Sequence, residues 1–179
     1  MLRLIGSMMS YQAYPFMVFS GVILIIALTN HLYMPKLSRS PGSLRRRLSI
    51  LVPARDEERN IEGCLASLLS QDHPDYEVVV LNDGSRDRTG EIIERLKLSY
   101  PNLRSLEGLP LPDGWRGKNW ACWQLARAAE GEVLLFTDAD TIHAEDSGSC
   151  ACSALMSSGA GLISGMVRQR MLTIPEMLL

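Results

Sequence analysis

The stretch that decides the fold is Val133-Leu134-Leu135-Phe136-Thr137-Asp138-Ala139-Asp140. Five strand-forming or apolar residues lead directly into two carboxylates that stand one residue apart. A buried strand with this ending delivers two acids to the rim of a sheet, where α/β proteins bind their ligands. Two neighbouring carboxylates repel each other unless a cation joins them. The pair therefore predicts a divalent metal ion that carries a phosphate-rich ligand.

Strand-like and helix-like patterns alternate along the chain on both sides of this stretch. Short apolar runs predict strands, and apolar residues spaced three and four apart predict helices between them. The clearest helical stripe comprises Ile61, Cys64, Leu65, Leu68 and Leu69. Strands are expected at 48–53, 76–81, 101–106, 133–138 and 162–168, and helices from about Asp56, Asp87 or Thr89, Asn119 and Asp146 onward. This alternation predicts an α/β fold with a largely parallel sheet that helices cover on both faces.

Length and composition are those of an ordinary globular domain. The chain has 179 residues, of which 46% are hydrophobic and 21% are charged, and a disordered chain would be more polar. The net charge of −2 lacks the basic balance that indicates nucleic-acid binding. The four cysteines lack the spacing of a disulfide framework or a zinc site, so reduced thiols are expected.

The N-terminal segment, residues 1–46, has the pattern of a membrane anchor followed by a basic linker. Residues 14–34 are largely apolar and are about as long as the roughly 20 residues that cross a bilayer. Only Arg3 precedes them, whereas Lys36, Arg39, Arg45, Arg46 and Arg47 follow. This asymmetry predicts a single-pass anchor in the inner membrane, with the domain at 47–179 in the cytoplasm. A cleaved signal peptide or a buried helix is the alternative.

Three of the predicted strands end in acidic residues. Glu57 follows the first, Asp83 follows the second, and Asp138 and Asp140 end the fourth. Each acid has a simpler explanation: a first-turn helix acid, a turn residue before a glycine, or a solvated strand end. Carboxyl ends of parallel strands share one edge of the sheet, so the coincidence of all three favours a binding site.

The residue types at that edge suit a nucleotide together with a metal ion. The Asp83 carboxylate can accept a hydrogen bond from a base, and backbone groups after Pro53 can meet other base atoms. Asp138 suits a ribose hydroxyl or a metal-bound water, and Asp140 suits direct binding of Mg²⁺ or Mn²⁺. Lys118 lies in a glycine-bearing loop before a predicted helix, where a cation and free N–H groups suit a diphosphate. A solvated loop lysine is the alternative.

Other motifs carry less information. Neither G-x-x-x-x-G-K-[ST] nor G-x-G-x-x-G occurs, which disfavours a P-loop or dinucleotide-binding fold. His143 is close enough to Asp140 in sequence to approach a metal, although an exposed loop histidine is the simpler interpretation. Trp115, Trp120 and Trp123 suit an acceptor or lipid groove, but core packing is the stronger interpretation for the last two.

In three segments the sequence resembles glycosyltransferase family 2, whose members have the GT-A fold. The segments are SILVPARDEE at 49–58, LNDGSRDRT at 81–89 and TDAD at 137–140, and the resemblance extends over about 49–176. It implies an enzyme that transfers a sugar from a nucleoside-diphosphate sugar by metal-dependent inverting transfer. Segments 112–121 and 165–169 are similar to membrane-linked members associated with hopanoid and carotenoid pathways. This finer similarity implies a lipid or isoprenoid acceptor.

The resemblance also implies roles for individual residues. The nucleoside would be held by Pro53, Arg55, Glu57, Leu81 and Asp83. The diphosphate would be approached by Lys118. Ribose, phosphate and a Mg²⁺ or Mn²⁺ ion would be held by Asp138, Ala139 and Asp140, with Asp140 and Asp138 as the metal ligands.

The sequence departs from the family pattern in three places. Asp56 stands where asparagine is common, and Asn82 stands where an aspartate is common. Inverting members also carry a catalytic carboxylate well after the D-x-D pair, and no residue after Asp140 matches it. The chain is therefore expected to be the donor-binding half of an interrupted domain. A catalytically inactive, membrane-anchored fragment is the alternative, and a nucleotidyltransferase would need a glycine- and lysine-rich loop that the first strand lacks.

Overall fold

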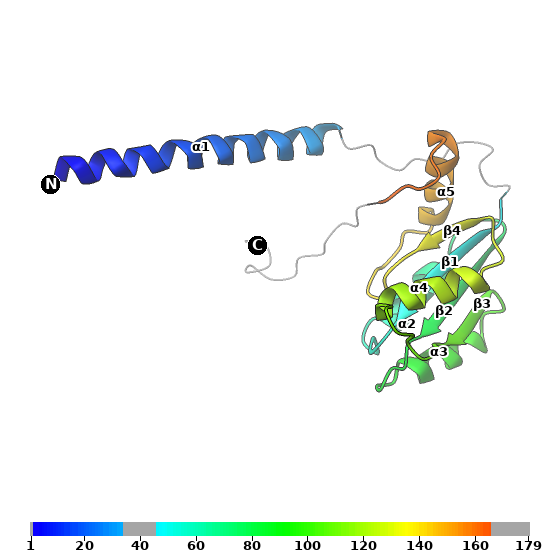
Figure 1. The fold of residues 1–179 in the computed structure, drawn as a ribbon. Coiled ribbons are helices and arrows are strands. Elements are labelled where there is room, and N and C mark those ends of the chain that lie inside the picture. The colour runs from blue at the N-terminus through cyan, green and yellow to red at the C-terminus, as the bar shows by residue number, and fades with distance from the viewer. Residues whose placement is uncertain (1, 34–45, 166–179) are drawn as a thin grey trace. The chain divides into compact units, whose positions relative to one another are not determined.

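The computed structural model of this chain describes residues 2–33 and 46–165, with side chains described at 14–30, 32, 33 and 46–165. The chain divides into two compact units, Met1–Lys36 and Leu37–Leu179. In its described part the first unit is one long helix, α1 (Leu2–Tyr33), and the second is an α/β domain (Figure 1). The predicted basic linker lies largely outside the described residues.

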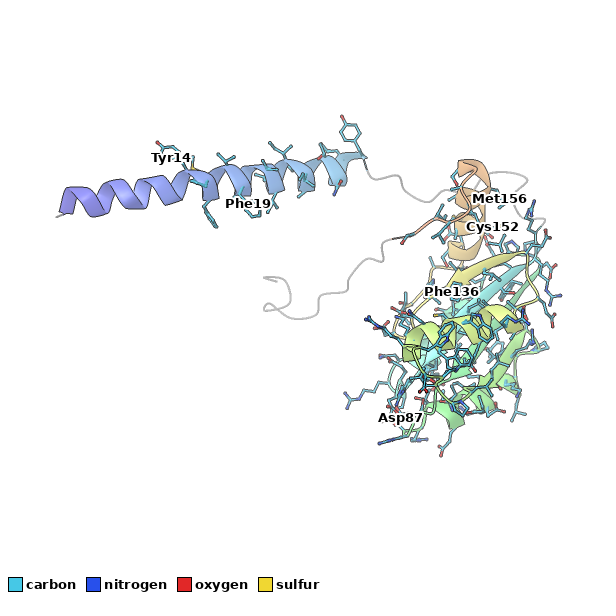
Figure 2. All side chains as sticks on the ribbon, viewed as in Figure 1. Tyr14, Phe19, Asp87, Phe136, Cys152 and Met156 are labelled. Atoms are coloured by element: carbon cyan, nitrogen blue, oxygen red, sulfur yellow. The ribbon has the colours of Figure 1, made fainter. Side chains whose placement is uncertain are left out.

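Helix α1 exposes apolar side chains on more than one side, among them Tyr14 and Phe19 (Figure 2). The sequence predicted a membrane-spanning helix over 14–34. Within the described part of the chain, however, no helix combines the length and the apolar character needed to cross a membrane. The predicted membrane-spanning helix at 14–34 is therefore not supported. The predicted location at the inner membrane stays a prediction.

The α/β domain is built on a parallel sheet of four strands. In chain order the strands are β1 (Leu48–Ala54), β2 (Tyr76–Asn82), β3 (Leu103–Glu107) and β4 (Val133–Phe136), and their order in the sheet is β3-β2-β1-β4. The helices between and after them are α2 (Ile61–Leu69), α3 (Thr89–Lys97), α4 (Gly117–Ala128) and α5 (Ser147–Ser158). The predicted parallel α/β architecture is confirmed. The fifth predicted strand is not found over 162–165, and 166–168 lie outside the described residues.

The two faces of the sheet bury alternate residues of each strand. Ile50 and Val78 pack on one face with the apolar stripe of α2, together with residues of α3 and α5. Leu51 and Val79 point to the other face, where they pack against α4. Both central strands are buried along most of their length, as the continuous apolar runs in the sequence predicted. Helices thus cover both faces and leave the strand ends to the loops (Figure 1).

Three of the differences between the predicted and observed element boundaries bear on the site. Helix α2 begins at Ile61, because the acids at 56–58 form a turn whose Glu57 carbonyl accepts the Ile61 N–H at 2.9 Å. Helix α4 begins at Gly117, two residues before the predicted cap Asn119. Strand β4 ends at Phe136, the last residue paired with β1, so both carboxylates of the D-x-D pair lie beyond the strand.

A buried carboxylate, Glu77, organises the opposite, amino-terminal edge of the sheet. Its Oε1 accepts hydrogen bonds from Ser49 Oγ at 2.6 Å and from the Glu130 N–H at 2.7 Å. Its Oε2 accepts one from Arg104 Nη1 at 2.7 Å. The Ser49 hydroxyl in turn accepts the Gly131 N–H at 2.8 Å. One side chain on β2 therefore ties β1 and β3 to the segment that leads into β4.

Candidate functional site

The carboxyl ends of β1, β2 and β4 lie at one edge of the sheet, because these strands are parallel. The chain leaves them through loops at 55–60, 83–88 and 137–146. Each loop contains acids that the sequence pattern singled out. In open α/β sheets this edge is where ligands bind.

A cavity of about 350 Å³ opens between these loops and the start of α4. Its lining comprises the acids Glu57, Asp83, Asp138 and Asp140, the cations Arg55 and Lys118, and the small or apolar residues Pro53, Ala54, Gly117, Ala121 and Ala139. Carboxylates and cations in one cavity suit a ligand with both hydrogen-bonding groups and negative charge, held in part through a metal ion.

Reciprocal hydrogen bonds join the loop after β1 to the loop after β2, where Asp87 is labelled in Figure 2. In each bond a backbone N–H of one loop meets a side-chain oxygen of the other loop or, in one case, of Thr89 at the start of α3. The bonds run from Asp56 N–H to Ser85 Oγ (3.1 Å), Arg86 N–H to Asp56 Oδ1 (2.7 Å), Glu57 N–H to Thr89 Oγ1 (2.8 Å), Glu58 N–H to Asp87 Oδ2 (3.0 Å) and Arg88 N–H to Glu58 Oε2 (3.2 Å). They fix the two cavity walls that carry Arg55 and Asp83.

Asp56 is the residue of this loop pair with the most demanding backbone, and replacing it tests the arrangement. Its φ of 54° lies in the left-handed region, which aspartate and asparagine tolerate better than alanine. Asp56→Ala also loses the bond to Arg86 N–H, so we expect a loss of about 2 kcal/mol in unfolding free energy. Urea unfolding measures it. Asp56→Asn should stay within about 0.5 kcal/mol of the original, and equal losses in both variants would contradict this explanation.

Asp83 sits against two glycines at the base of the cavity, and its side chain is 21% exposed. Its N–H continues the sheet ladder to Ala54 O at 2.8 Å. A Cβ added at Gly108 would lie 3.1 Å from Asp83 Oδ1, and one at Gly117 would lie 3.7 Å from Oδ2. Arg55 Nη1 approaches Oδ2 at 3.5 Å. The two glycines leave space for the Asp83 carboxylate, and the Arg55 guanidinium lies beside it in the cavity lining.

The D-x-D pair is held in a turn that α2 supports from below. Thr141 N–H donates to Asp138 O at 3.3 Å, and the Cys64 thiol donates to the same carbonyl at 3.6 Å. Burial raises the pKa of the Cys64 thiol to about 12, so it stays protonated as this bond requires. Ala139 is buried in the core, whereas Asp138 and Asp140 on either side are exposed and line the cavity. The turn thus presents two carboxylates and anchors itself through the residue between them.

His143 supports this turn and does not line the cavity. Its Nε2 lies 2.8 Å from Thr137 Oγ1, and its backbone N–H donates to Ser67 Oγ on α2 at 3.1 Å. Burial lowers the pKa of the imidazole below its ordinary value. The prediction of an exposed loop histidine is therefore wrong: His143 is half-buried and connects the D-x-D segment to α2.

Lys118 lies in the first turn of α4, which points its amino end at the cavity. No side-chain hydrogen bond caps this end in the described structure, and first-turn N–H groups favour anions. Lys118 Nζ is 2.7 Å from Asp138 Oδ1. This hydrogen bond raises the pKa of Lys118 above its ordinary value, although partial burial opposes the shift. Lys118 therefore lies on a helix and not in a loop, and it pairs with an acid of the same cavity while its side chain stays 66% exposed. Its predicted role at a diphosphate stays a prediction.

A cluster of three tryptophans holds the glycine-bearing loop on α4. The ring centroids of Trp120 and Trp123 are 4.8 Å apart and stacked, and Trp115 meets Trp120 edge-on at 5.2 Å. Trp120 Nε1 donates to Leu109 O at 3.1 Å. Trp123 is 44% exposed, so the core packing predicted for it is not found. The cluster fixes where the loop enters α4, and thereby where Lys118 lies. Its predicted part in an acceptor groove stays a prediction.

The donor set suits a hard divalent cation whose remaining positions are filled by phosphate oxygens and water. Asp138 and Asp140 offer oxygen ligands, as Mg²⁺ and Mn²⁺ prefer, and the Lys118 ammonium already stands beside one of them as a cation. Among the described residues no group of three or more histidine, cysteine, aspartate and glutamate side chains could hold a metal ion. Two carboxylates with positions left for phosphate and water are what Mg²⁺ uses in nucleotide sites.

The structure brings together eight of the nine site residues that the sequence proposed. The exception is Leu81, which is fully buried beside Ala121 under the cavity floor and does not line it. Sequence reasoning missed Ala54, Gly117 and Ala121. Small residues give little signal, although Gly117 next to Lys118 at a helix start was visible in the sequence.

Comparison with known proteins identifies the family. The family model described as glycosyl transferase family 2 matches residues 49–164. A 4,4'-diaponeurosporenoate glycosyltransferase of Staphylococcus haemolyticus is 33% identical over 99 residues, which cover 55% of this chain and 25% of that protein. Glycosyltransferase AglE of Haloferax volcanii is 30% identical over 122 residues, covering 67% of this chain and 39% of that protein. The chain thus spans less than half the length of these relatives.

Solved structures agree with the fold. The mannosyltransferase PcManGT from Pyrobaculum calidifontis, in complex with GDP-Man and Mn²⁺, is 29% identical with a TM-score of 0.60, over 76% of this chain and 40% of that one. Residues 1–349 of TarS from Staphylococcus aureus, in complex with UDP-GlcNAc, are 30% identical with a TM-score of 0.51, over 69% and 37%. These likenesses confirm the predicted α/β fold of GT-A type. Because the family model covers most of the chain, including every loop of the cavity, the chain belongs to glycosyl transferase family 2.

Proposed function

We propose that the cavity binds a nucleoside-diphosphate sugar and that the chain is the donor-binding part of a glycosyltransferase. The observation that carries this proposal is the convergence of Asp83, Lys118 and the D-x-D carboxylates on one cavity. Similar proteins solved with GDP-Man and Mn²⁺ or with UDP-GlcNAc support it.

The cavity has two chemically distinct ends. Asp83, with Arg55 beside it, lies in a glycine-lined recess that suits the hydrogen-bond donors of a base. Lys118 and the amino end of α4 suit a diphosphate, and Asp138 and Asp140 would hold Mg²⁺ or Mn²⁺ on the phosphate side. When bound, the metal ion would neutralise the charge on the leaving nucleoside diphosphate.

For the acceptor we propose a lipid or an isoprenoid. The relative named for 4,4'-diaponeurosporenoate supports an acceptor of lipid or isoprenoid type. Transfer also needs a base that deprotonates the acceptor hydroxyl. No described residue after Asp140 lines the cavity, so a nucleotide-binding chain without transfer activity is the second candidate. Sugar transfer by the purified chain would refute that second candidate.

The division of the cavity into two ends can be tested with Asp83→Ala. In the presence of Mn²⁺ this change should weaken UDP or GDP binding by about tenfold, because one charge-assisted hydrogen bond to the base is lost. The affinity for inorganic pyrophosphate should change less than twofold, since pyrophosphate has no base and would contact only the end with Lys118, Asp138 and Asp140. Calorimetric titration of both ligands measures this. Equal weakening of pyrophosphate and nucleotide would contradict the assignment of Asp83 to the base.

A further inference from the structure

The cations and anions of the cavity are paired with one another inside the site. Arg55 Nη1 lies 3.5 Å from Asp83 Oδ2, and Lys118 Nζ lies 2.7 Å from Asp138 Oδ1. All four side chains line the cavity. The pair of Lys118 and Asp138 is the closer of the two. In the proposed function Lys118 binds the diphosphate and Asp138 binds the metal ion.

The Lys118 ammonium stands beside Asp138, an acid that would also hold the proposed metal ion. Both side chains are largely exposed, at 66% and 59%, so the pair is weak and exchangeable. Lys118 comes from the first turn of α4, and Asp138 from the turn after β4. A cation that takes Asp138 would release a lysine at the helix end where a diphosphate would bind.

We propose that Lys118 is a positioning residue that serves as the internal counter-ion of Asp138 and couples binding of the divalent cation to binding of the nucleoside diphosphate. The inference rests on the proposed function. Without ligand, Lys118 offsets one of the two D-x-D charges and competes with a metal ion. With metal and donor both present, the metal ion balances the carboxylates and Lys118 turns to the diphosphate. Lys118 therefore weakens binding of the metal ion alone and strengthens binding of the metal ion together with the nucleotide.

The sign of each effect distinguishes this role from a structural one. Lys118→Met should increase the affinity for Mn²⁺ alone by about two- to fivefold, the range of an exposed ion pair. The same variant should decrease the affinity for UDP or GDP in saturating Mn²⁺ by about tenfold. Damage to the cavity would weaken both.

The experiment measures free Mn²⁺ by electron paramagnetic resonance and nucleotide binding by calorimetry. Lys118→Arg keeps the cation and should keep the affinity for Mn²⁺ alone within twofold of the original. Lys97→Met removes a lysine on α3 that pairs with Glu94, and it should change neither affinity. The three tryptophans next to Lys118 report folding of this region by fluorescence.

Two failures are distinguishable. If the original chain binds no nucleoside diphosphate with Mn²⁺, the proposed function itself is wrong. If the original chain binds it but Lys118→Met leaves the affinity for Mn²⁺ alone unchanged or lower, the counter-ion role of Lys118 is overturned and the proposed function stands.

Discussion

Asp140→Asn is expected to weaken binding of UDP or GDP in the presence of Mn²⁺ by at least about 100-fold. Loss of an outer partner of a metal ligand typically costs 10- to 100-fold in metal affinity, so loss of a direct ligand should reach the upper end or exceed it. Asp140 lines the cavity and directly follows the buried Ala139 in the chain. Asparagine has nearly the same size as aspartate but carries no charge. Calorimetric titration at fixed Mn²⁺ measures the change.

A matched control separates this effect from a general change of charge. Glu91→Gln neutralises an exposed acid on α3 that pairs with Arg88, outside the cavity lining. Its nucleotide affinity should stay within twofold of the original. Removal of Mn²⁺ by EDTA should bring the original chain down to the level of Asp140→Asn. Full affinity in a folded Asp140→Asn protein would show that this carboxylate does not hold the metal ion.

Glu77→Gln is expected to cost about 2–4 kcal/mol in unfolding free energy at pH 7. The Glu77 side chain is 4% exposed and accepts hydrogen bonds from three donors. Glutamine replaces one acceptor oxygen with an NH₂ group that would face a donor, so a buried donor loses its partner. Urea unfolding measures the loss. Glu132→Gln, at a surface ion pair with Arg46, should cost less than about 1 kcal/mol.

The cost of Glu77→Gln should depend on pH. Burial alone raises the pKa of the Glu77 carboxyl, but hydrogen bonds from Ser49, the Glu130 N–H and Arg104 outweigh it, so the pKa lies below its ordinary value of 4.5. The ionised group therefore contributes stability above pH 4.5, and this contribution is lost as the pH falls through the lowered pKa. The difference between the two proteins should shrink below pH 4.5. A difference that grows in acid would contradict the network.

The acids at the two edges of the sheet show what sequence patterns can predict. Parallel strands share their carboxyl edge, so an acid directly after each strand is enough to place Glu57, Asp83 and Asp140 together. Glu77 gives no such signal. It lies inside a valine-rich strand, and its partners come from three other segments of the chain. The sequence predicts the strand, but only the folded structure shows which groups donate hydrogen bonds to the Glu77 carboxylate.

Contacts between loops are also beyond sequence reasoning. The residues at 56–58 are acidic, and the prediction placed them in the first turn of a helix. In the structure Asp56 adopts a left-handed backbone and bonds Arg86, because the loop after β2 lies beside it. The pairing of Lys118 with Asp138 likewise depends on where α4 begins, and that boundary differed from prediction by two residues.

The most direct test of the site is a calorimetric titration of the chain with UDP and with GDP, each with Mn²⁺ and each with EDTA. A cavity built for a nucleoside diphosphate should bind at least one of the two nucleotides with Mn²⁺ and bind it at least about 100-fold more weakly with EDTA, because the D-x-D carboxylates then face the phosphates without a cation between them. Absence of binding for both nucleotides, or equal affinity with and without the metal ion, would contradict the proposed metal-dependent donor site.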